Sequence, residues 1–397
     1  MANASVPYSG RSWRSLNKPT RLNYLSLPAI IICPPESEKR TVAALSVVDR
    51  LVVAAFRAGC STICVVANAQ PNLKRSQAWR IPFTVQDRCP EVEAPSLVVA
   101  ATWLLQAPDL RQAIVQRGRL VTRSGILVPA GLVTTDDIAG QVPASFSTSE
   151  NVLKVLSRRP QVQAEAVAEE VTDDVSARRA TQALWQSITS SSDGFVDRWF
   201  NRPVGRLVFS KPLIWTPVTP NQISLVSIAV GLAGAWLIAS GNYASTIWGA
   251  MLFQLSAVID CVDGDVARIV FKESKLGKWL DLGGDQVVHI GIFGSIAWGL
   301  HRAGSSAPVL ILGSACIVGA LLSFAVILHG ILRPPAGPAQ SRLQALIDGA
   351  TSRDFSVLVL ALACLGRLEW FLWLTAIGSQ VFWITALVLQ RRRDPAR

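Results

Sequence analysis

Apolar residues follow two different patterns along the chain, and the change falls near residue 180. In the first part, three short β-rich runs stand apart: PAIIIC at 28–33, STICVVAN at 61–68 and PSLVVAA at 95–101. A helical pattern over 41–58 separates the first two runs, and Gly59 is the expected C-cap of that helix. Strands that alternate with helices predict a mostly parallel sheet in a soluble, Rossmann-like α/β domain.

Long apolar segments dominate the second part, from Pro220 onward. Six candidate spans lie at 223–240, 243–259, 287–300, 308–332, 355–365 and 370–390. A helix that crosses a bilayer needs about 20 residues, or about 17 at the least, so the fifth span must borrow flanking residues. This pattern predicts an α-helical integral membrane domain with six transmembrane helices.

Together these patterns divide the chain into six segments. They are a basic N-terminus at 1–27, the α/β domain at 28–163, a charged and then serine-rich linker at 164–194, an amphipathic segment at 195–215, the six-span domain at 216–390 and a basic tail at 391–397. The amphipathic segment mixes Arg and Lys with Phe, Trp and Leu, which is typical of a helix in the membrane interface with its basic side toward lipid phosphates. The alternative is a surface helix packed on the α/β domain.

The composition agrees with a membrane protein, because half of the 397 residues are hydrophobic and the net charge is +11. No Lys/Arg-rich tract interleaved with aromatic residues is present, so nucleic acid is not an expected partner. The seven cysteines are odd in number and lack a repeating spacing, which indicates neither a disulfide framework nor a zinc site. The N-terminus lacks the apolar core of a signal peptide, so we expect the first domain in the cytoplasm.

Basic residues predict the orientation, because Lys and Arg concentrate in short cytoplasmic loops. They follow the second, fourth and sixth spans: Arg268, Lys272, Lys275, Lys278, Arg333, Arg342, Arg353, Arg391, Arg392, Arg393 and Arg397. The opposite loops hold only Arg302 and Arg367. We therefore expect a multi-pass protein of the cell membrane, with both termini and the loop after the second span on the cytoplasmic side.

Acidic residues interrupt the apolar pattern between the second and third spans. Asp260 and Asp263 end one span at i,i+3 spacing, and Asp281 and Asp285 begin the next at i,i+4, so each pair lies on one helix face. Four uncompensated acids at a bilayer centre would cost on the order of 10 kcal/mol. Two converging faces would instead form a site for a hard divalent cation, Mg²⁺ or Mn²⁺, with one or two ions. Asp265 falls off both faces, and we expect it to face solvent or to pair with a lysine.

Glycine and arginine surround these acids. Gly264, Gly277, Gly283 and Gly284 remove side-chain bulk where backbones or a ligand come close. Arg268 can place a guanidinium against a phosphate. A metal site, glycines and an arginine together indicate a phosphate-bearing substrate.

The spacing of these residues resembles the complete signature of the CDP-alcohol phosphotransferase family, also called the CDP-alcohol phosphatidyltransferase family. All eight specified residues are present: Asp260, Asp263, Gly264, Ala267, Arg268, Gly277, Asp281 and Asp285. The stretch TPVTPNQIS at 216–224 resembles the family's entry into its first span. The resemblance therefore extends over 195–390.

The resemblance implies a reaction and a role for each residue. Family members cleave the pyrophosphate of a CDP-linked alcohol, pass the alcohol's phosphate to a second alcohol and release CMP. Asp260, Asp263 and Asp281 would hold two Mg²⁺ or Mn²⁺ ions, and Asp285, in the same metal-binding set, would be the catalytic base. The implied CDP contacts are Asn221, Gln222, Gly264, Arg268, Ser274 and Gly277. A homodimer formed through the spans is implied as well.

The two alcohols stay open. The donor is CDP-diacylglycerol or a CDP-polyol such as CDP-inositol. Arg333, Arg342 and Arg353 lie in the loop after the fourth span, where relatives that use an inositol phosphate acceptor bind its phosphate. These arginines indicate an anionic acceptor, or they only satisfy the positive-inside rule.

The first domain resembles the nucleotidyltransferase domain of inositol-phosphate cytidylyltransferase/di-myo-inositol-phosphate-phosphate synthases, through DRLVVAAFRAGCSTICVVAN at 49–68. The nucleotide loop departs from that family, because CPPESEKRTV at 33–42 has no glycine and its prolines remove backbone donors. A metal-binding aspartate is replaced by Ala100, Ala101 and Thr102. The resemblance implies a scaffold that has lost catalysis and serves a structural, dimer-forming or regulatory role.

Two other classes of function fit parts of the pattern. An ion transporter also carries intramembrane acids, but those acids would be spread along a pore, whereas these gather at one end of two helices. A noncatalytic membrane scaffold would not need the intact signature.

Overall fold

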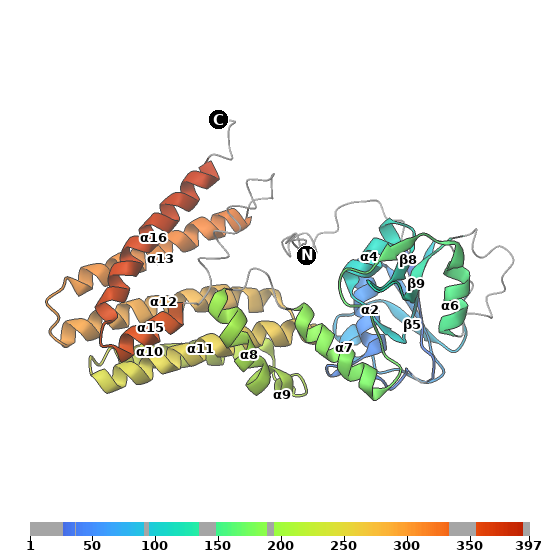
Figure 1. The fold of residues 1–397 in the computed structure, drawn as a ribbon, viewed down its shortest axis with the longest axis horizontal. Coiled ribbons are helices and arrows are strands. Elements are labelled where there is room, and N and C mark those ends of the chain that lie inside the picture. Colours follow the sequence, from blue (N-terminus) through green and yellow to red (C-terminus); the bar gives the residue numbers. More distant parts are fainter. Residues whose placement is uncertain are drawn as a thin grey trace, which may run out of the picture. The chain divides into compact units, whose positions relative to one another are not determined.

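The computed structural model of the chain describes residues 27–35, 37–90, 95–134, 148–188, 194–332 and 355–391. These residues form two compact units, Met1–Thr189 and Ser190–Arg397 (Figure 1). The first unit contains the sheet and the second is helical. The predicted division into an α/β domain and an apolar helical domain is therefore confirmed.

The first unit is built on a seven-stranded sheet with the order β10-β8-β9-β6-β1-β4-β5. Its strands are β1 Pro28–Ile32, β4 Thr62–Val66, β5 Phe83–Gln86, β6 Ser96–Ala100, β8 Arg119–Val121, β9 Leu127–Val133 and β10 Gln161–Gln163. The central strand β1 runs parallel to both β4 and β6, and β4 runs parallel to β5. Only β9 is antiparallel to its two neighbours, which confirms the mostly parallel sheet.

Helices cover both faces of this sheet, which explains why its strands are continuous apolar runs. One side of β1, with Ile30 and Ile32, packs against Val152 and Val155 of α6 (Ser149–Val155). Helices α2 (Val47–Ala58) and α4 (Ala107–Val115) contact each other and belong to the other layer (Figure 1).

The helix predicted over 41–58 begins only at Val47, where the Ser46 side chain accepts a hydrogen bond from the amide of Asp49. The residues before it form a small hairpin of β2 (Thr41–Val42) and β3 (Leu45–Ser46). Its turn residues Ala43 and Ala44 have φ of 46° and 67°. Alanine disfavours such turns, so periodicity alone could not reveal this one. The predicted C-cap is confirmed, with Gly59 at φ 114°.

A buried arginine holds this hairpin in place. Arg50 on α2 is 2% exposed and donates hydrogen bonds of 2.8 Å to the carbonyls of Val42 and Ala43. Burial lowers the pKa of Arg50 to about 9, and the neighbouring Asp49 carboxylate opposes that shift. The guanidinium thus supplies buried hydrogen-bond donors to two carbonyls of the tight turn.

The predicted linker at 164–194 is largely structured and belongs to the first unit. Strand β11 (Glu169–Glu170) pairs with β7 (Trp103–Leu104), and helix α7 (Asp174–Ser187) follows it. Ala180 and Leu184 are buried on α7. Their i,i+4 spacing is hidden among charged residues, which is why composition alone indicated a linker.

The second unit contains six long helices in its described residues: α10 Pro220–Ile238, α11 Tyr243–Ile269, α12 Lys275–Arg302, α13 Val309–Leu332, α15 Phe355–Cys364 and α16 Leu368–Arg391. Four of them, α10, α11, α13 and α16, are long and apolar enough to cross a membrane. Helix α12 has 28 residues but carries lysines and acids in its first turns, and α15 has 10 residues. Six spans are therefore not confirmed.

Before α10, residues 195–213 are helical, with α8 (Arg202–Gly205) and α9 (Lys211–Leu213) joined to π-helical turns. From here on, the name amphipathic segment refers to these residues, 195–213. Phe195, Trp199 and Leu207 are at least 70% exposed on it, whereas Asn201 and Ser210 are fully buried. The predicted two-sided helix is thus present.

Close backbone contacts set the spacing of the long helices. A Cβ at Gly234 of α10 would lie 2.6 Å from the carbonyl oxygen of Gly249 on α11, and one at Gly299 of α12 would lie 2.4 Å from that of Ile238. Only glycine permits this approach. All six helices then contribute to one apolar core, in which the rings of Phe253 and Phe355 lie 5.5 Å apart.

The cysteines of the first unit make a first prediction. Burial raises the pKa of Cys60 to about 12, and burial together with Glu38 raises the pKa of Cys33 to about 11. We expect alkylation of both thiols at pH 8 to be at least ~10²-fold slower in the native protein than in urea, because the reactive thiolate is scarce. Mass spectrometry of labelled peptides measures this.

Since the folded state holds the Cys33 and Cys60 protons more tightly than the unfolded state, the stability of the first unit should also fall as the pH rises above about 9. Rapid native labelling of Cys60 would contradict the burial described here.

Candidate metal site

Three carboxylates meet where the end of α11 lies beside the start of α12. Asp260 of α11 and Asp281 and Asp285 of α12 each bring an oxygen within 4.8 Å of the others. Asp281 is exposed and the other two are partly exposed. Hard oxygen donors at this spacing fit a cation such as Mg²⁺ or Mn²⁺ after small side-chain movements. The i,i+4 pair on α12 and one acid of α11 thus converge as the sequence predicts.

Asp263, the fourth predicted ligand, lies outside this group of three. It is 6% exposed, and the hydroxyl of Ser224 on α10 donates a hydrogen bond to its Oδ2. Successive helical residues turn by about 100°, so Asp263 points about 60° away from Asp260, toward α10. Ser224 is a partner that the sequence analysis missed, although it stands in the 216–224 stretch.

The prediction for Asp265 was wrong. The residue is 1% exposed, and its two oxygens pair with Nη1 of Arg202 and Nε of Arg206 at 2.6 Å each. Asp265 lies about 200° around α11 from Asp263, so it faces the amphipathic segment and not solvent. The i,i+4 spacing of the two arginines was the available signal for this contact.

The same contact corrects the prediction that the basic side of the amphipathic segment faces lipid phosphates. Arg202 and Arg206 turn inward to a carboxylate, because a buried acid needs a counter-charge. Arg198 and Lys211 remain exposed on the segment.

Three of the predicted CDP contacts gather where α10 and α12 begin. Ser274 is the N-cap of α12 and accepts a hydrogen bond of 2.9 Å from the amide of Gly277. Its hydroxyl also donates to Oδ1 of Asn221, at 3.4 Å. A Cβ at Gly277 would lie 2.8 Å from that oxygen and 3.0 Å from the Ser274 hydroxyl. The missing side chain at Gly277 is therefore what lets the three residues meet.

Arg268 and Gly264 form a second pair beside the acids. The Arg268 Nε donates to the carbonyl oxygen of Gly264 at 3.1 Å, and a Cβ at Gly264 would lie 2.9 Å from Nη2 of Arg268. The guanidinium thus folds back over bare backbone, one turn beyond the aspartates. Gln222 instead closes the capping box of α10, where its Oε1 accepts from the Thr219 amide at 2.9 Å.

Two further groups of residues can be placed. His289 lies one turn after Asp285, and its ring is 4.9 Å from that of Phe355, so it packs among aromatic rings. The predicted acceptor residues Arg333, Arg342 and Arg353 lie outside the described residues.

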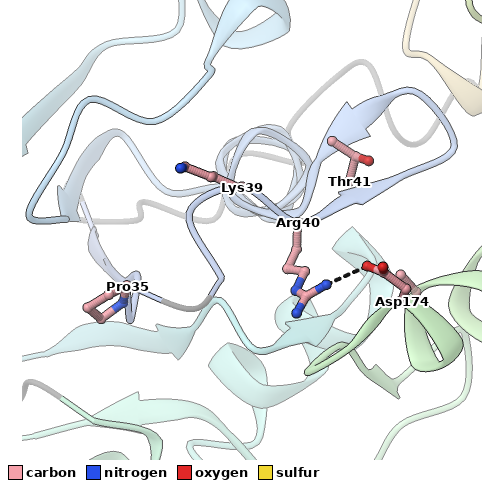
Figure 2. Close-up of a pocket in the computed structure, with 6 residues that line it drawn as sticks. Pro35, Lys39, Arg40, Thr41 and Asp174 are labelled. Atoms are coloured by element: carbon pink, nitrogen blue, oxygen red, sulfur yellow. Dashed lines mark hydrogen bonds and ion pairs between the residues drawn. The ribbon is translucent and has the colours of Figure 1, made fainter.

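The first unit has a pocket of its own at the loop after β1 (Figure 2). Its volume is about 320 Å³, and it is lined by Pro35, Lys39, Arg40, Thr41, Asp174 and Ala177. Arg40 points toward Asp174, the first residue of α7, and pairs with it at 2.5 Å (Figure 2). Of the two cations that line this pocket, Arg40 is thus matched by a carboxylate of the chain.

The loop after β1 is held by hydrogen bonds at the carboxyl edge of the sheet. One Glu38 oxygen accepts hydrogen bonds of 2.9 and 3.1 Å from the amides of Asn68 and Ala69, which follow β4. Ligands of open α/β sheets bind at this edge, through backbone amides that face an anion. Here an internal carboxylate occupies two of those amides.

Residues 217–378 match the family model described as CDP-alcohol phosphatidyltransferase. This part of the chain is therefore a domain of the CDP-alcohol phosphatidyltransferase family, as the signature predicts.

Two kinds of curated relatives are similar to the chain. It is 31% identical over 122 residues to the bifunctional IPC transferase and DIPP synthase of Aquifex aeolicus, which covers 31% of this chain and 27% of that protein. It is 38% identical over 112 residues to the phosphatidylinositol phosphate synthase of Corynebacterium glutamicum, which covers 28% of this chain and 49% of that protein. The matched region thus spans about a quarter of the bifunctional relative and about half of the synthase.

Solved structures are also similar. The crystal structure of Mycobacterium tuberculosis phosphatidylinositol phosphate synthase with CDP-DAG bound aligns at a TM-score of 0.34 and 19% identity, over 48% of this chain and 92% of that chain. The same protein in complex with manganese and citrate aligns at a TM-score of 0.34 and 18% identity, over 48% of this chain and 88% of that chain.

The contact of Gly277 with Asn221 and Ser274 makes a second prediction. A methyl group at position 277 collides with both side chains, so Gly277→Ala should weaken the binding of CDP to the solubilised protein about tenfold or more. Isothermal titration measures this affinity. Gly283→Ala is the matched control on the same helix, because its Cβ meets nothing within 4 Å. Equal CDP affinity in the two variants would contradict the assignment of this corner to CDP.

Proposed function

We propose that the protein is an integral membrane CDP-alcohol phosphotransferase. It transfers a substituted phosphate from a CDP-alcohol to an acceptor alcohol and releases CMP. The observation that carries this proposal is the convergence of Asp260, Asp281 and Asp285 beside Arg268, inside the region that matches the family. An ion pathway is less well supported, because these acids gather at one end of two helices.

The three carboxylates are the groups that would hold a divalent cation, with Asp263 one turn along α11 as a further oxygen donor. When bound, Mg²⁺ or Mn²⁺ would neutralise the pyrophosphate and stabilise the charge that develops on the departing CMP. Arg268 lies where its guanidinium can bind a phosphate oxygen with two N–H donors. Gly264 and Gly277 let the side chains of Arg268, Asn221 and Ser274 lie against the backbone, where they would contact the nucleotide.

Asp285 is proposed as the base. The acceptor hydroxyl loses its proton to the Asp285 carboxylate and forms a bond to the phosphorus that carries the donor alcohol. The bond between that phosphorus and the bridging oxygen breaks, and CMP leaves with the electron pair. A carboxylate within hydrogen-bond reach of the hydroxyl is sufficient for this proton transfer.

An inositol-containing substrate is the proposed chemistry of the two alcohols. The names of two kinds of relatives support it, since one is described as phosphatidylinositol phosphate synthase and the other as IPC transferase and DIPP synthase. A third kind is described as putative cardiolipin synthase. CDP-diacylglycerol and CDP-inositol are the two donors to compare. An inositol phosphate is the acceptor to test first, with Arg333, Arg342 and Arg353 as its proposed binding residues.

The remaining expectations are part of the proposal. The protein would lie in the cell membrane with both termini and the acids on the cytoplasmic side, and it would be a homodimer. The amphipathic segment would lie in the interface, with Trp199, Leu207, Arg198 and Lys211 on its exposed side.

We propose that the α/β unit does not transfer nucleotides. Glu38 occupies the amides of Asn68 and Ala69, and Ala100, Ala101 and Thr102 offer no carboxylate after β6. Consumption of CTP with an inositol phosphate or sugar phosphate by the purified protein would overturn this.

A CMP-release assay tests the main proposal. Purified protein with Mg²⁺ should release CMP from CDP-diacylglycerol or CDP-inositol when an inositol phosphate is added. Asp285→Asn should lower the rate by about 10²-fold or more, because the base is lost while the shape remains. Glu369→Gln is the control, an acid on α16 that accepts a hydrogen bond from Ser305. A fully active Asp285→Asn variant would disprove the mechanism.

Metal removal gives a separate test. EDTA should abolish CMP release, and added Mn²⁺ or Mg²⁺ should restore it, because three clustered carboxylates repel a pyrophosphate when no cation is bound. Asp281→Asn should raise the Mn²⁺ concentration for half-maximal rate about tenfold or more. Activity that persists after complete chelation would rule out the proposed metal site.

A further inference from the structure

A buried ionic contact joins the amphipathic segment to α11. Asp265 is 1% exposed, and its oxygens lie 2.6 Å from Nη1 of Arg202 and from Nε of Arg206. The two arginine side chains are themselves only 10% and 16% exposed. One carboxylate therefore bridges two successive turns of the segment away from water. We call Asp265, Arg202 and Arg206 the clamp.

Neighbouring contacts fix the same two elements together. Asn201 is fully buried, and its side-chain oxygen accepts a hydrogen bond of 2.7 Å from the side-chain amide of Gln254 on α11. Along α11, the next contact lies between Gln254 and Asp265. There, a Cβ at Gly205 would lie 3.1 Å from Val262 and 3.2 Å from the carbonyl oxygen of Val258. The segment is thus in backbone contact with α11 at its middle and has polar contacts on both sides.

The clamp acts on the turn of α11 that carries the acids. Asp260 reaches the acids of α12, Asp263 reaches Ser224 of α10, and Asp265 reaches the amphipathic segment. These aspartates point in three different directions, so their three contacts together fix the rotation of α11 about its axis. Without the contact to Asp265, the turn of α11 that carries the acids loses its charged contact with the segment.

A buried ion pair is a weak source of stability, because desolvation offsets most of the attraction. Removal of one partner leaves the others charged and buried, and the local structure must move to solvate them. A contact of this kind is therefore well suited to specifying one arrangement. Catalytic geometry is sensitive to such movement, since a displacement of about 1 Å can cost about 10²-fold in rate.

We infer that Asp265, Arg202 and Arg206 are positioning residues for the metal site. They set the rotation of α11 that brings Asp260 to the acids of α12. The same contact ties that turn to a segment whose outer side is apolar, so the site keeps a fixed depth relative to the lipid interface. The inference rests on the proposed function where its test measures CMP release. Where its test measures Mn²⁺ binding, it rests only on the acid cluster.

The test compares Asp265→Asn with Arg198→Gln. Arg198 is an exposed arginine of the same segment, and the control also removes one charge. We expect Asp265→Asn to bind Mn²⁺ about tenfold more weakly, as measured by electron paramagnetic resonance of the solubilised protein. Its kcat for CMP release should fall about 10- to 100-fold, with a smaller change in KM for the CDP-alcohol. Arg198→Gln should match the parent in all three.

A triple variant separates position from charge. Arg202→Met, Arg206→Met and Asp265→Leu together replace the clamp by apolar side chains that can pack the same contact. If position is what matters, this variant should recover most of the Mn²⁺ affinity and of the rate. Gly205→Ala is an independent probe, because it pushes the segment from α11 without any charge change, and it should also weaken Mn²⁺ binding.

Each possible result of these measurements either supports or overturns the inference. Parental Mn²⁺ affinity and kcat in Asp265→Asn overturn the inference, and so does a triple variant that folds but stays as weak as Asp265→Asn. If Asp265→Asn does not fold, Gly205→Ala and the triple variant decide by the same measurements. If the parent binds Mn²⁺ but releases no CMP, the proposed function fails, while the Mn²⁺ affinities still test the clamp.

Discussion

The second unit depends on how it accommodates carboxylates among apolar helices. An ionised acid in such surroundings is tolerated only with a partner of opposite charge, a hydrogen-bond donor or a cation. The structure uses a different solution on each side of α11. Asp265 is neutralised by two arginines and Asp263 receives a hydroxyl from Ser224, whereas Asp260 converges with Asp281 and Asp285. Only in the last group do several carboxylates lie close to one another. Their combined negative charge is the reason to expect a cation there.

The glycines make this arrangement possible. Gly234 and Gly299 bring the backbones of α10, α11 and α12 together, and the acids at one end of these helices then face one another. At that same end, Gly264 and Gly277 lack side chains, which lets Arg268 and Asn221 lie close to the backbone. An anionic, nucleotide-sized ligand is consistent with this combination of bare backbone, guanidinium and carboxylates. All of these residues lie within 217–378, the part of the chain that matches the family model.

In the first unit, by contrast, three charged side chains are matched by groups of the chain itself. Its sheet has the edge at which ligands usually bind, yet Glu38 caps the amides of Asn68 and Ala69, and Arg40 pairs with Asp174. Arg50 similarly satisfies the carbonyls of a strained hairpin. The loop after β1 also has no glycine, and no acid directly follows β6.

The sequence by itself determined the two kinds of unit, three strands at the centre of the sheet, three of the four expected acids of the cluster and the resemblance of the second unit to its family. These depend on periodicity and on local spacing, which survive in one dimension. Only the tertiary structure decided the hairpin before α2, the placement of α7 in the first unit, the bond from Ser224 to Asp263 and the burial of Asp265. Each of these joins residues through contacts that helical or strand periodicity does not encode. Asp265 and its arginines are about 60 residues apart in the chain, and spacing on one helix shows which way a side chain points but not what meets it there.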